Sequence, residues 1–186
     1  MEPIDHSYPE PEKGSARLIG VRYGIILSLI GLGVQLFTYL TGGDDPEKGG
    51  GLGSVIGCLS IVIVIAVIIM AIKTYRDNVL GGFLSFTEGM SVMFWLALVY
   101  SIYTALSNWL YNNVIAPEAN ERVEQLIEKT RALVEDGEAD PLELTVIETT
   151  YQVMNNPLSV MVITFVILMV IGAIASLILT RARSYQ

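Results

Sequence analysis

Four long stretches of this chain contain no charged residue, and they limit what the chain can fold into. The shortest has 18 residues and the longest 26; they are residues 23–40, 52–72, 90–115 and 158–179. A helix needs about 20 apolar residues to cross the roughly 30 Å hydrocarbon core of a bilayer. The sequence therefore predicts an all-α, polytopic membrane protein. Its four transmembrane helices are expected near residues 18–41, 52–75, 88–116 and 157–181.

The distribution of charge supports one membrane domain preceded by a tail. Charged residues make up 16% of the chain, whereas soluble domains carry about 25%. Residues 1–17 hold three prolines and four acids, a composition typical of disorder. We expect residues 1–17 to form a disordered cytoplasmic tail, and residues 18–183 to form the four-helix membrane domain.

Basic residues predict the orientation of the spans, because Lys and Arg near span ends favour the cytoplasmic side. With four spans, both termini and the second loop share one side, which holds seven basic residues: Lys13, Arg17, Arg22, Lys73, Arg76, Arg181 and Arg183. The other side holds four, and three of them lie in a long acidic loop. We expect the bacterial inner membrane, with both termini cytoplasmic.

The third span is unusually polar. Ser101, Thr104, Asn108 and Asn112 share one helical face. Polar groups inside a bilayer must face protein or water. Gln35 in the first span lies at about the same depth as Ser101, by the helical rise of 1.5 Å per residue. These five residues form the candidate polar intramembrane cluster, in which Gln35 is expected to have Ser101 or Thr104 as its nearest polar side chain.

The segment between the third and fourth spans, residues 117–156, is the candidate partner-binding surface. Residues 116–157 hold ten acids and three basic residues, a formal charge of −7. Apolar spacing predicts two amphipathic helices, about 117–135 and 141–155, separated by the turn-forming sequence DGEADP. They are expected to form a hairpin, packed against each other or on the membrane rim.

Each of these helices has a predicted apolar stripe. The stripes are Val123, Leu126, Ile127 and Leu133 or Val134 on the first, and Leu144, Ile147, Tyr151 and Met154 on the second. At the start of the third span, Glu88 is the candidate helix-start acid, because an acid is favourable at a helix N-terminus. Either Thr87 or Ser85 would be its N-cap.

Residues that membrane enzymes use are missing from the four uncharged stretches. The only histidine, His6, lies in the tail, and the lone Cys58 has no partner for a disulfide. Metalloprotease, aspartyl protease, serine protease and haem-binding chemistry each need groups that the spans lack. We expect no enzyme activity, no catalytic residue, no metal site and no cofactor.

Three sequence segments resemble a known family. They are LSFTEGM (84–90), LYNNVIAPEANERVEQLIEKT (110–130) and NNPLSVMVITFVILMVIGAIASLI (155–178). Together with the short glycine-rich first loop, they resemble the family called domain of unknown function 4199, small four-helix membrane proteins of bacteria. The resemblance covers about residues 18–183. It implies an integral membrane protein of four spans and implies no catalytic activity.

Two functions remain open. The first is a non-enzymatic interaction protein, a scaffold or accessory subunit. The alternative is a small transporter or channel subunit with a polar path along the third helix. The expected partners are the lipid bilayer, a protein bound through the acidic loop, and further copies of this chain; nucleic acid is not expected as a partner of a chain with a net charge of −8.

Overall fold

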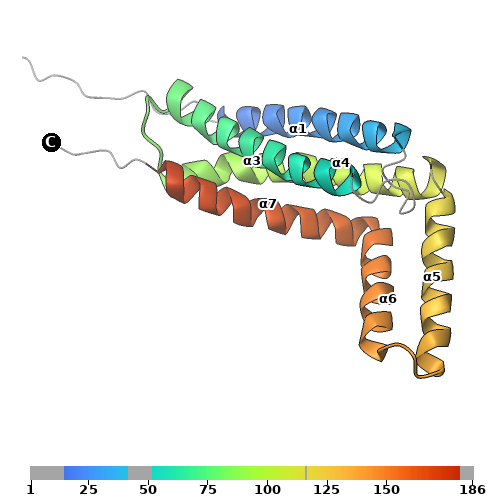
Figure 1. The fold of residues 1–186 in the computed structure, drawn as a ribbon. Helices are drawn as coiled ribbons and strands as arrows, with labels where there is room; N and C mark the ends of the chain where they lie inside the picture. The colour runs from blue at the N-terminus through green and yellow to red at the C-terminus, as the bar shows by residue number, and fades with distance from the viewer. Residues whose placement is uncertain (1–14, 42–51, 116, 181–186) are drawn as a thin grey trace, which may run out of the picture. The chain divides into compact units, whose positions relative to one another are not determined.

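The structure is a computed structural model that describes residues 15–41, 52–115 and 117–180 (Figure 1). Its helices are α1 (Ser15–Leu40), α3 (Leu52–Asn78), α4 (Phe86–Leu110), η1 (Tyr111–Ile115), α5 (Pro117–Glu135), α6 (Pro141–Asn155) and α7 (Pro157–Leu179). By length and composition, α1, α3, α4 with η1, and α7 can each cross a membrane. The predicted all-α polytopic fold with a helical hairpin before the last span is confirmed.

The helix bounds lie close to those expected from the sequence. The helix α1 begins at Ser15, so residues 15–17, which we had assigned to the tail, are helical. The rest of the predicted tail, residues 1–14, lies outside the described residues. The helix α4 ends at Leu110 and is followed by η1, a π-helical turn wider than an α-helix.

Proline marks the start of three helices. Pro117, Pro141 and Pro157 are the first residues of α5, α6 and α7. Proline is tolerated there because the first N–H groups of a helix have no intrahelical partner. Asp140 caps α6 by accepting a hydrogen bond from the Leu142 N–H at 2.9 Å. Asn156 accepts one from the Leu158 N–H at 3.0 Å, and so caps α7 in the same way.

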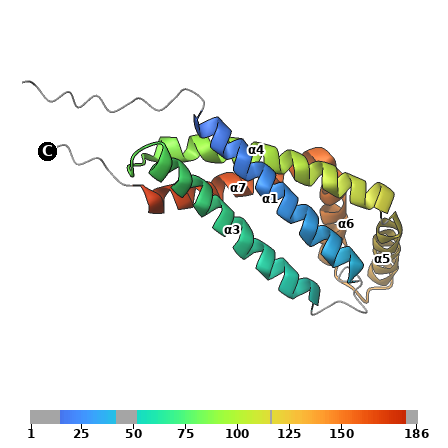
Figure 2. The same ribbon diagram turned by 90° about the horizontal axis from the view of Figure 1, so that it is seen from above.

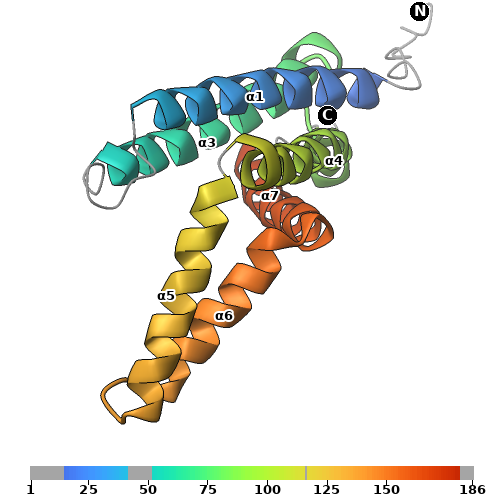
Figure 3. The same cartoon turned by 90° about the vertical axis from the view of Figure 1, so that its right-hand side faces the viewer.

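The chain forms two compact units. The first contains α1, α3, the part of α4 up to Val99 and the part of α7 from Leu168. The second contains residues 100–167. In the first unit, α1 lies beside α3 (Figures 1 and 3). The core of this unit is made of apolar side chains that are at most 1% exposed: Leu27, Ile68, Ala71, Ile72, Leu84, Val92, Met93, Leu96 and Ala97.

Glycines let α1 approach α4 closely. A Cβ atom added at Gly20 would lie 2.5 Å from the carbonyl oxygen of Val92. One added at Gly24, the next turn along, would lie 2.9 Å from the Cβ of Val99. The two helices therefore touch backbone to backbone along this strip, as small residues spaced by four allow in membranes. Figure 2 shows the first turns of α1 crossing α4.

The helix α7 approaches α4 in a similar way within the first unit. A Cβ added at Gly172 would lie 2.6 Å from the side chain of Met93, and one added at Gly89 would lie 2.5 Å from the Oγ of Ser176. Ser176 is fully buried, and its Oγ has no hydrogen-bond partner within the described residues. Its small side chain and Gly89 together allow the two helices to meet.

Polar contacts join α1 to its neighbours near its first turns. The Tyr23 hydroxyl and the Thr74 Oγ1 are 2.8 Å apart, which links α1 to α3. The Arg17 guanidinium lies 4.8 Å from the ring centroid of Trp95 in α4. Such a cation–π contact is worth about 0.5–2 kcal/mol. These side chains add specificity to a surface that is otherwise apolar.

In the second unit, α5 and α6 lie side by side as a hairpin (Figure 3). Val123, Ile127, Thr130 and Val134 form one face of α5, and Thr130 is only 7% exposed. Leu126 is 51% exposed, so its predicted place in this stripe is wrong. At 100° per residue, position 126 lies at the edge of this face, about 40° beyond Thr130, and it is left exposed there.

The stripe on α6 needs a similar correction. Leu144, Ile147 and Tyr151 are half-buried. Met154 is 53% exposed, so it lies outside the stripe in which the sequence placed it. The turn between the helices is closed by Gly137, whose φ of 75° is in the left-handed region that glycine adopts readily. The Glu138 N–H donates to the Leu133 carbonyl and the Gly137 N–H to the Val134 carbonyl, the pattern of a Schellman motif.

The close packing of α1 on α4 predicts that replacing a glycine of α1 destabilises the protein only where that glycine contacts α4. Gly20→Leu should lower the free energy of unfolding by about 1–3 kcal/mol, because the new side chain would overlap the Val92 backbone. Gly33→Leu is the matched control, since nothing lies within 4 Å of a Cβ at Gly33, and it should change stability by less than about 0.5 kcal/mol. Thermal unfolding of the purified protein in detergent measures both. Equal losses in the two variants would contradict this packing.

Candidate functional site

The candidate helix-start acid, Glu88, lies in the first turn of α4. Its Oε2 accepts hydrogen bonds from the Ser85 N–H and the Ser85 hydroxyl, each at 2.7 Å. The Ser85 Oγ accepts in return from the Glu88 N–H at 3.4 Å. This reciprocal pair is a capping box, so Ser85 rather than Thr87 is the N-cap. The Glu88 carboxylate is engaged with the backbone at the start of the span.

Four members of the polar cluster lie in the second unit, on the last part of α4 and in η1. Ser101 is buried at 1% exposure. The Thr104 Oγ1 donates to the Tyr100 carbonyl of its own helix at 2.9 Å. Gln35 lies in α1, in the first unit, and is half-buried. The predicted contact of Gln35 with Ser101 or Thr104 stays a prediction.

Asn108 connects α4 to the end of α6. Its Nδ2 donates to the Met154 carbonyl at 2.6 Å. Met154 lies in the last turn of α6, where carbonyls lack partners from the same helix. The amide of Asn108 therefore satisfies an acceptor at the point where the chain passes from the hairpin into α7.

Asn112 lies in η1, where the chain passes from α4 into α5. In a π-helix the Asn112 carbonyl would pair with the N–H of residue 117, but Pro117 has none. The Asn120 Nδ2 donates to this carbonyl at 3.0 Å. Asn120 is not among the residues predicted from the sequence, although an asparagine in the first turn after a proline was an available signal. Asn108 and Asn120 thus stabilise the two junctions of the hairpin.

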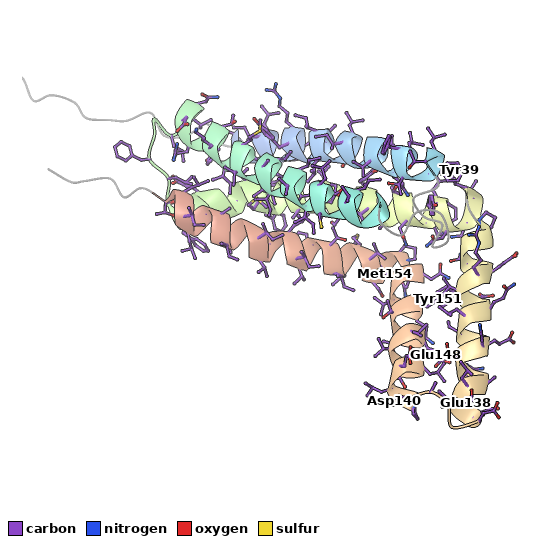
Figure 4. The ribbon with its side chains drawn as sticks, in the orientation of Figure 1. Tyr39, Glu138, Asp140, Glu148, Tyr151 and Met154 are labelled. Carbon is purple, nitrogen blue, oxygen red and sulfur yellow. The ribbon has the colours of Figure 1, made fainter. Side chains whose placement is uncertain are left out.

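Charged and hydroxyl groups join α5 to α6. The Arg131 Nη2 lies 2.6 Å from the Glu148 Oε1, and the Tyr151 hydroxyl donates to the Glu124 Oε1 at 2.9 Å. Glu148 and Tyr151 point from α6 toward α5 (Figure 4). Partial burial and the hydrogen bond to Glu124 raise the pKa of Tyr151 above its ordinary value. These pairs fix the register of the hairpin, and sequence spacing alone did not identify them.

Metal-ligating side chains do not gather in the part of the chain that the structure describes. No group of three or more His, Cys, Asp and Glu residues there could hold a metal ion. Cys58 is exposed on α3.

A stability measurement tests whether Asn108 holds the junction of α4 and α6 together, a role that a residue lining a water path would not have. Asn108→Ala should lower the free energy of unfolding by about 1–3 kcal/mol, because the Met154 carbonyl loses its donor. Asn113→Ala is the control: its amide donates to the Trp109 carbonyl of the preceding turn of its own helix, and the expected change is below about 0.5 kcal/mol. Thermal unfolding in detergent checks both. Unchanged stability of the Asn108 variant would argue against this junction.

Comparison with known proteins supports the resemblance noted in the sequence. The family described as Protein of unknown function (DUF4199) matches residues 22–180, which include α3, α4, the hairpin, α7 and all but the first seven residues of α1. No curated protein and no solved structure matches the chain. The match covers well over half of the 186 residues. The chain belongs to the family described as Protein of unknown function (DUF4199).

Proposed function

We propose that this membrane protein is a non-enzymatic scaffold or accessory subunit, and that it binds a protein partner through the acidic face of α5. The observation that carries the proposal is a row of carboxylates on one side of α5, which we call the acidic stripe: Glu121, Glu124, Glu128 and Glu135. All four residues are exposed. Their spacing of three, four and seven residues keeps them on one side of the helix.

Two features of the acidic stripe suit it to recognition of a basic partner. Arg131 lies beside the stripe but is paired with Glu148 of α6, so the stripe stays predominantly negative. A predominantly negative row steers a positively charged protein and increases its association rate. Glu121, Glu124 and Glu128, together with Gln125 and Ile127, also line a shallow hollow on α5. One apolar side chain, Ile127, lies among polar ones in this hollow, and the carboxylates around it are the groups that a basic partner would meet.

The bonds made by the polar cluster favour this proposal over a transport path. Thr104 bonds its own helix and Asn108 bonds the end of α6. Hydrogen bonds of this kind hold membrane helices together. The alternative function, a transporter or channel subunit, would require these polar groups to face water.

We propose the bacterial inner membrane, with both termini in the cytoplasm and the hairpin outside, as the distribution of basic residues suggests. Single cysteines in a Cys58→Ser background test this orientation. A cysteine at Glu138, in the hairpin turn, should react with a membrane-impermeant maleimide in intact cells. A cysteine at Asn78, at the end of α3, should react only after lysis. The reverse pattern would overturn the orientation.

Partner binding is tested by photo-crosslinking in intact cells. A photoreactive amino acid at Gln125, beside the acidic stripe, should form a discrete adduct. The adduct should be lost in the double variant Glu121→Gln, Glu128→Gln, because the steering charge is removed. It should persist in Glu143→Gln, a matched loss of one carboxylate on α6. The same reactive group at Leu29 in α1, which is 64% exposed, controls for nonspecific capture.

Two outcomes would contradict the proposal. An adduct that is equally strong in the double variant would mean that the acidic stripe does not select the partner. The absence of an adduct, together with ion or solute flux through liposomes containing the purified protein, would favour the transport reading instead.

A further inference from the structure

The side of α6 turned away from α5 carries two apolar side chains, Leu142 and Val146, that the described residues of the second unit leave exposed. Leu142 is 71% exposed and Val146 is 56% exposed. At 100° per residue, positions 142, 145, 146, 149 and 153 lie together on this side, and none of them is charged. We call this set, Leu142, Thr145, Val146, Thr149 and Val153, the outer face of α6.

The contacts of α6 with α5 confirm which side is which. Glu148 and Tyr151 bond residues of α5, and Leu144 and Ile147 are half-buried on the same side. These positions lie roughly opposite Leu142 and Val146 around the helix axis. The outer face is therefore not used to build the hairpin.

The outer face lies next to the start of α7, a helix apolar enough to contact lipid. Only Asn156 separates α6 from α7, a helix apolar enough to span a membrane. In the second unit, the first part of α7 leaves α6 at a sharp angle, on the side away from α5 (Figure 1). The first turns of α7 expose Leu158 and Val162. With α7 across the bilayer, this angle would lay α6 along the membrane surface, with its outer face toward the lipid.

Charge separates the two helices of the hairpin. Eight of the ten acids of this segment lie on α5 and the turn, and α6 carries only Glu143 and Glu148. Glu148 pairs with Arg131 of α5, and Glu143 lies at the border of the outer face. The Thr145 hydroxyl donates to the Pro141 carbonyl of its own helix at 2.9 Å. The outer face can therefore be removed from water without burying a charge. The Thr145 hydroxyl would keep its hydrogen bond to the Pro141 carbonyl.

We propose that the outer face of α6 binds the lipid surface of the membrane in which the protein resides. Leu142 and Val146 enter the boundary between headgroups and acyl chains, as the apolar side of an interfacial helix does. Covalent attachment to α7 holds this face beside the bilayer at high effective concentration, so a few apolar side chains suffice. The acidic stripe of α5 then faces water. This inference does not depend on the proposed protein partner or on which side of the membrane the hairpin lies.

The experiment uses the full chain, one copy per nanodisc, with Cys58→Ser and a single nitroxide spin label. The label is attached to Val146→Cys on the outer face, or to Glu128→Cys on the acidic stripe as the matched control. Collision rates with oxygen, which concentrates in lipid, and with a water-soluble nickel chelate report the surroundings of each label. The ratio of oxygen to nickel collisions should be several-fold higher at position 146 than at position 128.

Two results would overturn the proposal. A label at position 146 that is as open to nickel as the label at position 128 would mean that the outer face is in water. A label at position 146 shielded from both reagents would mean that protein covers it. If Val146→Cys does not fold, as judged by its helical circular dichroism, Leu142→Cys provides the same comparison from the same face.

Discussion

The close approach of backbones on α4 is the contact on which the membrane part of this structure depends. Between apolar helices in lipid, there is no hydrophobic driving force, so association depends on tight packing. Gly20 and Gly24 bring α1 against Val92 and Val99, and Gly172 brings α7 against Met93. Because each site leaves no room for a Cβ, these contacts determine which faces of the helices meet.

Polar groups act mainly where helices begin, end or change direction. Ser85 and Glu88 close the first turn of α4, and Asn108 and Asn120 satisfy carbonyls at the two junctions of the hairpin. Unpaired backbone groups are costly away from water. The polarity of the third span, which suggested a water path, is therefore accounted for in part by the need to build a hairpin at its end.

The hairpin itself has two different sides. Acids gather on α5 and in the turn, whereas α6 exposes uncharged residues such as Leu142 and Val146. The pairs Arg131–Glu148 and Glu124–Tyr151 hold the two helices in register. An element with an acidic side and an apolar side can rest on a membrane and still present its charge to a partner. The pairing of α5 with α6 makes this arrangement possible.

The sequence alone determined the four spans and the limits of the hairpin helices, because span length, proline at the first helical position and glycine in a turn act locally. It did not determine which side chains of α5 face α6. Leu126 was assigned to the apolar stripe of α5, yet it is 51% exposed, whereas Thr130 is buried on the face toward α6. The spacing of apolar residues shows roughly which side of a helix is buried. Which side chains lie at the middle of that side depends on where the partner helix packs. Only the tertiary structure could pair Asn108 with the Met154 carbonyl, 46 residues away, because nothing in either local sequence specifies the other.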